Sequence, residues 1–267
     1  MNEPVLLIEK DDGIAVVTLN RPDKMNSLSR DLRRELVTAF RALGEADDVD
    51  VAILTGRGRA FCAGLDLAEL SGENGGGEDA ESRRERENVV AGADVVAAVE
   101  QFGGPVIGAI NGFAITGGFE LALACDVLLA SEDARFADTH ARVGILPGWG
   151  LSQKLSRTLG IYRAKELSLS GNFLSAAEAA DWGLVNRVVP AAELLPAAKA
   201  LARDMQGCPR DVLRAYKRLI DEGSRETLKD ALVLESTRSR EHMRKVSAAD
   251  IAGRRAGVQS RGRNQGN

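Results

Sequence analysis

Two glycine-containing loops hold residues whose types and spacing could do chemistry. The first covers residues 59–67, shortly after an apolar run, and the second covers residues 111–120, directly after another. Small residues let the backbone approach a ligand closely. Backbone N–H groups, especially where Gly117 and Gly118 open a predicted helix, can stabilise a negatively charged oxygen. Each loop alone is also typical of an ordinary turn, and neither has the glycine spacing of a dinucleotide or phosphate loop.

Glu120 is the strongest single candidate for catalysis. It follows Gly117, Gly118 and Phe119 and precedes an apolar segment, so its carboxylate is expected to face the same ligand or to lie buried beside it. The alternative is a first-turn acid that the helix dipole favours.

The chain has two histidines, His140 and His242. His140 precedes the glycine- and proline-containing run 144–150, whereas His242 lies in a charged helical segment and is assigned to its solvated face. A lone histidine is more often a core or surface residue than a catalytic one. With no cysteine cluster beside them, no metal site is expected. No G-x-S-x-G segment, the mark of a nucleophile elbow, is present.

The elements that must position these residues alternate between strand and helix. Apolar runs predict a hairpin at 5–9 and 14–19 and strands at 51–54, 106–110 and 126–130. Helices are expected from Ser29 to about Leu43 and over 118–124. A loop at 71–80 is expected to be mobile, and a helix should follow over 81–102. After residue 190 the pattern is helical, with breaks near Pro209 and Gly223. We therefore expect an α/β core over 1–190 and a helical region over 191–267.

Composition restricts the partners of the chain. Its 267 residues include 35 Lys and Arg against 39 Asp and Glu, which gives a net charge of −4. A mildly acidic chain offers no general reason to bind nucleic acid or anionic lipid. The sequence has no run of about 18 apolar residues, so no membrane span is expected. Its first residues lack the pattern of a secretory signal. Three scattered cysteines fit a reducing compartment, and we expect a cytoplasmic protein.

Five segments together resemble the enoyl-CoA hydratase/isomerase, or crotonase, superfamily, and the resemblance runs over nearly the whole chain. Each segment is weak alone, but their order and spacing match the family. They are residues 20–28, 60–67, 105–126, 136–148 and 176–185.

The resemblance implies a crotonase-like α/β fold, which is a spiral of ββα units with a C-terminal helical region. It implies a homotrimer or a dimer of trimers, an acyl-CoA substrate, and neither a metal nor a separate cofactor, because coenzyme A is part of the substrate. The family's oxyanion hole, made by two backbone N–H groups, matches Leu65 and Gly117. The matching substrate-binding residues are Ala63, Leu65, Asp66, Leu67, Ala68 and Gly117.

In the family's hydratases two glutamates flank a water molecule. The first matches Glu120, whereas the second position holds His140 and Thr139 replaces the preceding proline. Imidazole can transfer protons near neutral pH, and Asp138 could instead supply a carboxylate or orient the ring. The leading interpretation is an enoyl-CoA hydratase with Glu120 and His140 as catalytic residues.

Other crotonase-family activities remain as alternatives: decarboxylase, thioester hydrolase and, less favoured, isomerase. Isomerases of the family generally keep the second glutamate and lack the first, which is the reverse of this sequence. A non-catalytic acyl-CoA-binding protein and an RNA-binding relative are the alternatives from other classes.

Overall fold

Two β-sheets organise the chain, and the computed structural model describes residues 3–70 and 93–265. The larger sheet has the strand order β1-β2-β3-β5-β7-β10, and the smaller has the order β4-β6-β8-β9. The larger sheet contains β1 (Leu6–Asp11), β2 (Ile14–Leu19), β3 (Val51–Gly56), β5 (Val106–Ile110), β7 (Val127–Ser131) and β10 (Arg187–Val189). The smaller contains β4 (Ala60–Cys62), β6 (Phe113–Ile115), β8 (Arg135–Ala137) and β9 (Leu174–Ser175).

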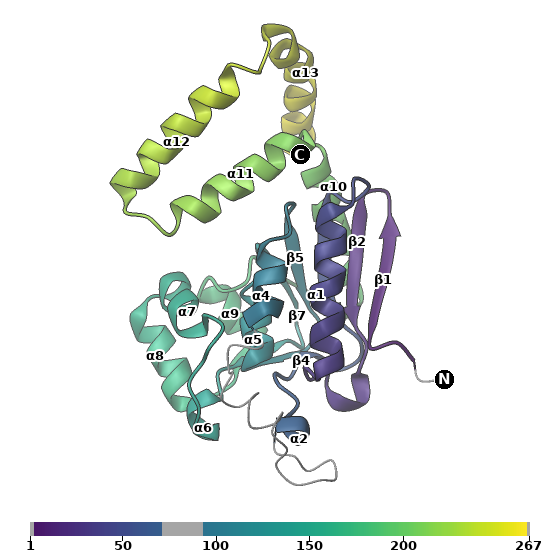
Figure 1. The fold of residues 1–267 in the computed structure, drawn as a ribbon, viewed down its shortest axis with the longest axis vertical. Coiled ribbons are helices and arrows are strands. Elements are labelled where there is room, and N and C mark those ends of the chain that lie inside the picture. Colours follow the sequence, from purple (N-terminus) through teal and green to yellow (C-terminus); the bar gives the residue numbers. More distant parts are fainter. Residues whose placement is uncertain (1–2, 71–92, 266–267) are drawn as a thin grey trace. The chain divides into compact units, whose positions relative to one another are not determined.

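A ββα unit is the repeat of this architecture. The antiparallel hairpin β1-β2 is followed by α1 (Arg30–Glu45), and then the pairs β3-β4, β5-β6 and β7-β8 each place the first strand in the larger sheet and the second in the smaller. The pair β5-β6 leads into α5 (Gly117–Ala122), and β7-β8 leads into α6 (His140–Val143). The pair β3-β4 precedes α2 (Leu67–Leu70) and α4 (Ala93–Glu100). The chain therefore spirals along both sheets at once (Figure 1).

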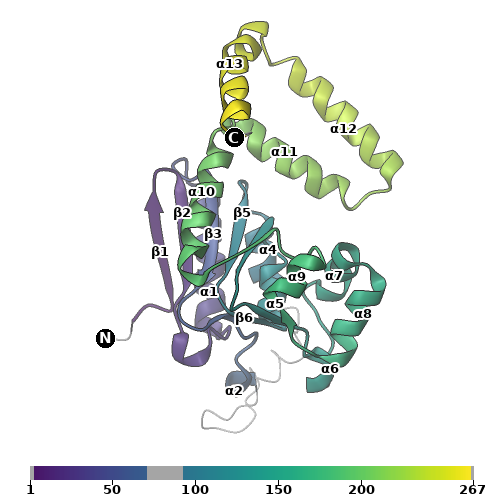
Figure 2. The same cartoon turned by 180° about the vertical axis from the view of Figure 1, so that it is seen from behind.

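Helices cover both faces of the central strands β2, β3, β5 and β7, which explains why these strands are nearly continuous apolar runs. On one face α1 and α4 lie side by side, and on the other lies α10 (Leu194–Gln206) (Figures 1 and 2). Successive strand residues alternate between the two layers: Ala52 and Leu54 pack in the core with α1, whereas Ile53 packs with Leu194 and other residues of α10.

The first helix follows the predicted pattern closely. The Ser29 side chain accepts a hydrogen bond from the Leu32 backbone N–H at 3.3 Å, as an N-cap residue does. The side chains buried along the helix are those that share its apolar face in the sequence: Leu32, Leu36, Ala39, Phe40 and Leu43.

The remaining helices follow β8 and α6 along the chain. They are α7 (Leu151–Leu159), α8 (Ile161–Ser170), α9 (Ala176–Asp181), α11 (Arg210–Gly223), α12 (Leu228–Met243) and α13 (Ala248–Gln265). Short 3₁₀ turns occur at Pro22–Lys24 and Ala191–Glu193. The last predicted helical stretch is in fact two helices. Ser247, whose hydroxyl accepts from the Asp250 N–H at 3.1 Å, caps α13 and separates it from α12.

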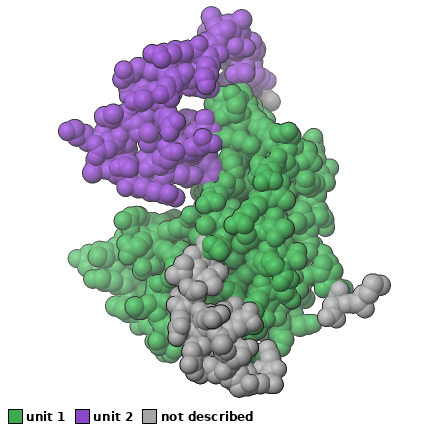
Figure 3. All heavy atoms as spheres, in the orientation of Figure 1, with its two compact units in different colours: residues 1–214 green, residues 215–267 purple. Residues whose placement is uncertain are grey.

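The chain divides into two compact units, residues 1–214 and 215–267 (Figure 3). The expected division at residue 190 stays a prediction. The loop predicted at 71–80 and the first part of the helix predicted over 81–102 lie outside the described residues, and α4 and Phe102 represent the rest of that segment. Among the described helices, none is both long and apolar enough to cross a membrane.

Candidate active site

Three loops follow neighbouring parallel strands of the smaller sheet. The carboxyl ends of these strands lie at the same edge of the sheet, so the loops meet there. Residues 63–66 follow β4, Thr116 follows β6, and Asp138 follows β8. Ile115 and Ala137 are paired in the register of β6 and β8, so the loops after these two strands begin level with each other. In open α/β sheets this edge is where ligands bind.

Glycine is required where the first two loops touch. Gly64 has a φ of +91°, and a Cβ on it would lie 3.0 Å from the Ile115 carbonyl oxygen and 3.2 Å from the Gly117 nitrogen. A Cβ on Gly118 would lie 2.0 Å from the Cys62 carbonyl oxygen. The start of α5 can therefore approach the β4 loop only because these positions lack side chains.

The backbone amides of Leu65 and Gly117 lie on these neighbouring loops. The Leu28 N–H donates to the Gly64 carbonyl at 2.7 Å and the Asp66 N–H donates to the Leu28 carbonyl at 3.4 Å, which holds the first loop without using the Leu65 N–H. Within residues 3–70 and 93–265, neither the Leu65 N–H nor the Gly117 N–H donates a hydrogen bond. Both remain available to a ligand.

Glu120 lies in α5 with a side chain that is only 2% exposed. Its Oε1 accepts hydrogen bonds from the backbone N–H groups of Trp149, at 2.8 Å, and Leu151, at 3.2 Å. Burial raises the pKa of the carboxyl, and these two bonds and the nearby His140 only partly oppose that rise. The raised pKa gives the carboxylate a greater affinity for a proton than an exposed glutamate has.

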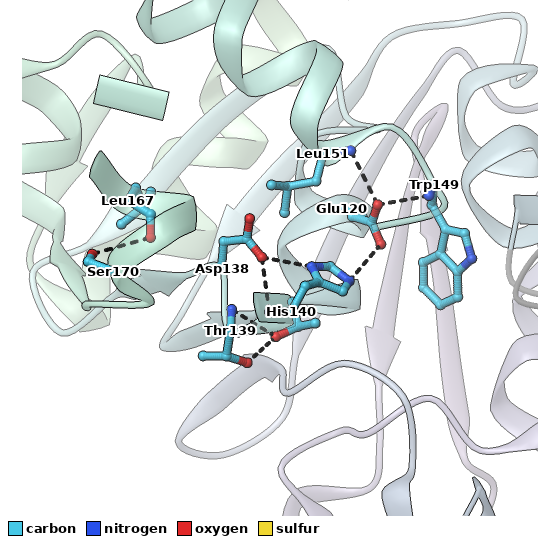
Figure 4. A network of polar contacts seen from close by, with 9 residues as sticks. Glu120, Asp138, Thr139, His140, Trp149, Leu151, Leu167 and Ser170 are labelled. Carbon is cyan, nitrogen blue, oxygen red and sulfur yellow. Dashed lines mark hydrogen bonds and ion pairs between the residues drawn. The ribbon is translucent and has the colours of Figure 1, made fainter. Parts of the chain in front are cut away.

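His140 faces Glu120 across a short gap. Its Nε2 lies 3.7 Å from Glu120 Oε2, and its Nδ1 lies 2.7 Å from Asp138 Oδ1 (Figure 4). Asp138 Oδ1 also accepts from the His140 backbone N–H at 3.2 Å. Burial alone would raise the pKa of Asp138, but hydrogen bonds from His140 and Ser168 outweigh it and hold that pKa below its usual value. Three ionisable side chains thus form a line from Asp138 through His140 to Glu120.

A hydroxyl pair joins the loops that follow β6 and β8. The Thr116 and Thr139 Oγ1 atoms lie 2.5 Å apart, and the Thr139 N–H donates to Thr116 Oγ1 at 3.4 Å. Thr116 has a φ of +54° and a ψ of −113°, a conformation that is rare for a β-branched residue and typical of functional sites when it occurs. The pair links the backbone before Gly117 to the loop that carries His140.

An ion pair anchors the other end of the first loop. The Arg21 guanidinium Nη2 lies 2.9 Å from Asp66 Oδ2, and Arg21 Nη1 also donates to the Ser27 carbonyl at 2.5 Å. Burial opposes ionisation of Asp66, yet the hydrogen bond from Arg21 holds the pKa of Asp66 below its usual value. Asp66 is thus engaged in structure, and the Ala63 N–H is likewise used, in a bond to the Met25 carbonyl.

A cysteine nucleophile and a bound metal ion have little support at this edge of the smaller sheet. Burial raises the pKa of the Cys62 thiol to about 12, so it stays protonated and is a poor nucleophile. Across the part of the chain that the structure describes, no cluster of three or more His, Cys, Asp or Glu side chains is arranged to hold a metal ion.

Comparison with known proteins decides the family. The family model for enoyl-CoA hydratase/isomerase matches residues 9–257. The chain is 44% identical to "Probable enoyl-CoA hydratase 1, peroxisomal" of Arabidopsis thaliana, over 90% of this chain and 87% of that protein. The chain belongs to the enoyl-CoA hydratase/isomerase family.

Other members of the family agree in sequence and in structure. The short-chain-enoyl-CoA hydratase of Clostridium acetobutylicum is 35% identical over 86% of each chain. The crystal structure of the enoyl-CoA hydratase from Bacillus anthracis matches with a TM-score of 0.86 at 34% identity and covers 96% of each chain. The family and the α/β crotonase-like fold predicted from the sequence are therefore confirmed.

The structure brings together most of the residues that the sequence singled out. Glu120 and His140 face each other, and Leu65 and Gly117 lie on touching loops. Leu67 begins α2 with Ala68 as its next residue, one step beyond the Arg21–Asp66 pair. Their roles as catalytic and substrate-binding residues stay predictions of family membership.

Sequence reasoning missed three contributors to this site. The Trp149 and Leu151 amides bind Glu120 from 29 and 31 residues away, and backbone donors carry no side-chain signature. Their signal was the glycine pair flanking Trp149, since Gly150, with a φ of +107°, caps α7 and exposes amides there. Thr116 had no signal, because its positive φ contradicts the preference of its residue type.

Proposed function

We propose that the protein is an enoyl-CoA hydratase, a hydro-lyase that adds water across the double bond of a 2-enoyl-CoA thioester. The observation that carries this proposal is the buried Glu120 carboxylate, which faces the His140 imidazole at 3.7 Å beside two available backbone amides. The names of the relatives from Arabidopsis and Clostridium support the same activity.

The Leu65 and Gly117 N–H groups would form the oxyanion hole. They would bind the thioester oxygen, which gains negative charge as the enolate forms. Donors held by the backbone need no rearrangement during the reaction, and one such donor is worth about 3 kcal/mol of barrier. Ala63, Asp66, Leu67 and Ala68 would bind the coenzyme A part of the substrate through the same loop.

Glu120 and His140 would divide the proton transfers of hydration. The Glu120 carboxylate takes a proton from water as the hydroxyl oxygen bonds to Cβ, and protonated His140 gives a proton to Cα. The product thus gains the elements of one water molecule. Because Glu120 Oε1 is held by two amides, Oε2 is the oxygen free to act as the base.

The two amides would stabilise the charge on the thioester oxygen and the two side chains would carry the protons, so we propose that the reaction needs no metal and no cofactor beyond the coenzyme A of its substrate. A homotrimer or a dimer of trimers, and a cytoplasmic location, are proposed on the grounds of the sequence. Two relatives are named peroxisomal and mitochondrial, so fractionation of the source cells is the test of location. Light scattering tests the assembly, and a stable 28.5 kDa monomer at micromolar concentration would contradict it.

The decisive assay uses crotonyl-CoA with the purified full chain. Hydration removes the conjugated double bond, so absorbance of the enoyl thioester should fall while no free thiol appears. Release of free coenzyme A would instead indicate a thioester hydrolase, and loss of carbon dioxide from a malonyl-type thioester would indicate a decarboxylase. Binding of crotonyl-CoA without turnover would refute the enzymatic proposal.

A further inference from the structure

Asp138 makes a pattern of contacts that specifies where His140 carries its proton. Oδ1 of Asp138 accepts from the His140 backbone N–H at 3.2 Å, and it lies 2.7 Å from Nδ1 of the same residue. Ser168 on α8 also helps to hold the pKa of the carboxyl below its usual value. An ionised carboxylate can only accept hydrogen bonds, so the ring nitrogen that faces it must be the one that bears hydrogen.

The other ring nitrogen, Nε2, is then the one that can exchange a proton. With Nδ1–H committed to Asp138, Nε2 is the nitrogen that faces Glu120 Oε2 at 3.7 Å (Figure 4). The side chains of His140 and Asp138 are 7% and 4% exposed, so water competes little for either atom. The charged groups that face the ring are Asp138, from the loop after β8, and Glu120, from α5.

We propose that Asp138 is a positioning residue that keeps a proton on His140 Nδ1 and thereby makes Nε2 the atom that exchanges protons with substrate and with Glu120. This inference rests on the proposed hydratase function. It assigns to a residue outside the two-glutamate pattern the task of setting the direction of proton transfer.

The arrangement closes the proton cycle of hydration. At the start Glu120 is ionised and His140 is protonated on both nitrogens, with Nδ1–H bonded to Asp138. Water gives one proton to Glu120, and Nε2 gives one proton to Cα. Glu120 is then protonated and His140 is neutral. Transfer of one proton from Oε2 to Nε2, which lie 3.7 Å apart, through a water molecule that hydrogen-bonds to both atoms from the side, restores the starting state without a proton from bulk solvent.

A pair of variants separates the hydrogen bond from the charge. In Asp138→Asn the side-chain oxygen must still face His140, because the His140 backbone N–H can only donate. Nδ1–H therefore keeps its acceptor while the negative charge is lost. In Asp138→Ala both are lost. Comparison of the two variants tests whether the hydrogen-bond acceptor at position 138 determines which ring nitrogen of His140 bears the proton.

The direct readout is the protonation of the ring, measured by NMR on the full chain labelled with ¹⁵N-histidine. Only His140 and His242 contribute, and His242, near the end of α12, serves as the internal reference. At a pH where His140 is neutral, wild type and Asp138→Asn should carry the proton on Nδ1. Asp138→Ala should show a shift toward the Nε2–H form.

Kinetics supply the second readout. The kcat of Asp138→Ala on crotonyl-CoA should fall by at least about 10-fold, which is less than the roughly 10²–10⁴-fold contribution of a group that itself transfers the proton. The fall should be smaller for Asp138→Asn, and KM should change little in both, as expected when ground-state binding is untouched. Wild-type His140 with its proton on Nε2, or an Asp138→Ala ring identical to wild type, would overturn the inference.

The two proposals fail in different ways. A wild-type protein that does not hydrate any enoyl-CoA refutes the hydratase function, whereas the ring measurement needs no turnover and tests Asp138 alone. If Asp138→Ala does not fold, the wild-type ring and the Asp138→Asn ring still decide the question, because both must carry the proton on Nδ1.

Discussion

Replacing Glu120 by glutamine removes its capacity to accept a proton and little else. Oε1 accepts from the Trp149 and Leu151 amides, and a glutamine oxygen can accept the same two bonds. The new NH₂ group then takes the place of Oε2, opposite His140. Because the oxygen is fixed by two backbone donors, the orientation of the amide is fixed as well, and the shape of the site should be kept.

The expected loss follows from the size of a general-base contribution. Such groups contribute about 10²–10⁴ in rate, so turnover should fall by at least about 100-fold, or about 2.7 kcal/mol at about 1.36 kcal/mol per decade. Stability should not fall. Burial raises the pKa of Glu120, so its stabilising contribution is complete below the unfolded pKa and is lost as the pH rises through the folded pKa. At neutral pH the ionised Glu120 is buried at a cost in folding free energy, and the uncharged glutamine does not carry that cost.

The assay is loss of enoyl absorbance with crotonyl-CoA, together with calorimetric binding of the thioester and a thermal melt. Glu35→Gln is the matched control. Glu35 is exposed on α1, so this substitution makes the same chemical change at a surface position outside the site. The control should retain wild-type turnover. Near wild-type turnover in a folded Glu120→Gln protein would refute the role of Glu120 as base, and a melt lowered by several degrees would refute the structural reasoning.

The other predictions concern the same site and the first helix. Since the pKa of Glu120 is raised, kcat/KM should decline with falling pH at a value above that of an ordinary glutamate, about 4.3; a rate that stays flat down to that pH would disagree. His140→Gln, measured in the crotonyl-CoA assay, should lower turnover by about 100-fold, and an unchanged rate would make His140 a packing residue. A Cβ on Gly117 would lie 2.8 Å from the Trp149 ring, so Gly117→Ala should lower kcat and Gly117→Ala with Trp149→Ala should recover part of it; no recovery would argue against the clash. Ser29→Ala removes the cap of α1 and should cost about 1 kcal/mol in a denaturant melt without changing turnover; an unchanged melt would contradict the capping role.

Local chemistry made much of the architecture predictable. The N-cap residue Ser29 predicts where α1 starts, and the 3.6-residue spacing of apolar residues along 30–45 predicts its buried face. Strands β2, β3, β5 and β7 are predicted from short apolar runs because they are covered on both faces. Strand β10 is not predicted, since it has three residues and no fully buried side chain. The break between α12 and α13 is not predicted, since Ser247 and Asp250 cap through local hydrogen bonds and residues 244–250 contain neither glycine nor proline to mark a break.

The site was predictable in composition but not in geometry. Glu120 and His140 stood out by residue type and by family position, and the structure places them face to face. Their separation, and the two amides that hold Glu120, depend on where α7 begins relative to α5. That relation is a long-range packing result, and no window of sequence around Glu120 contains it.

The spiral of ββα units has a consequence for how this chemistry can change. The loops that follow β4, β6 and β8 come from successive turns of the spiral, and each contributes a separate part of the site. The amides belong to the first two turns, and the Asp138–His140 pair belongs to the third. Substitutions in the third loop can therefore replace the group that faces Glu120 while the Leu65 and Gly117 amides stay in place. The site is modular in this sense, because one turn of the spiral can change its side chains while the backbone of the other two turns is kept.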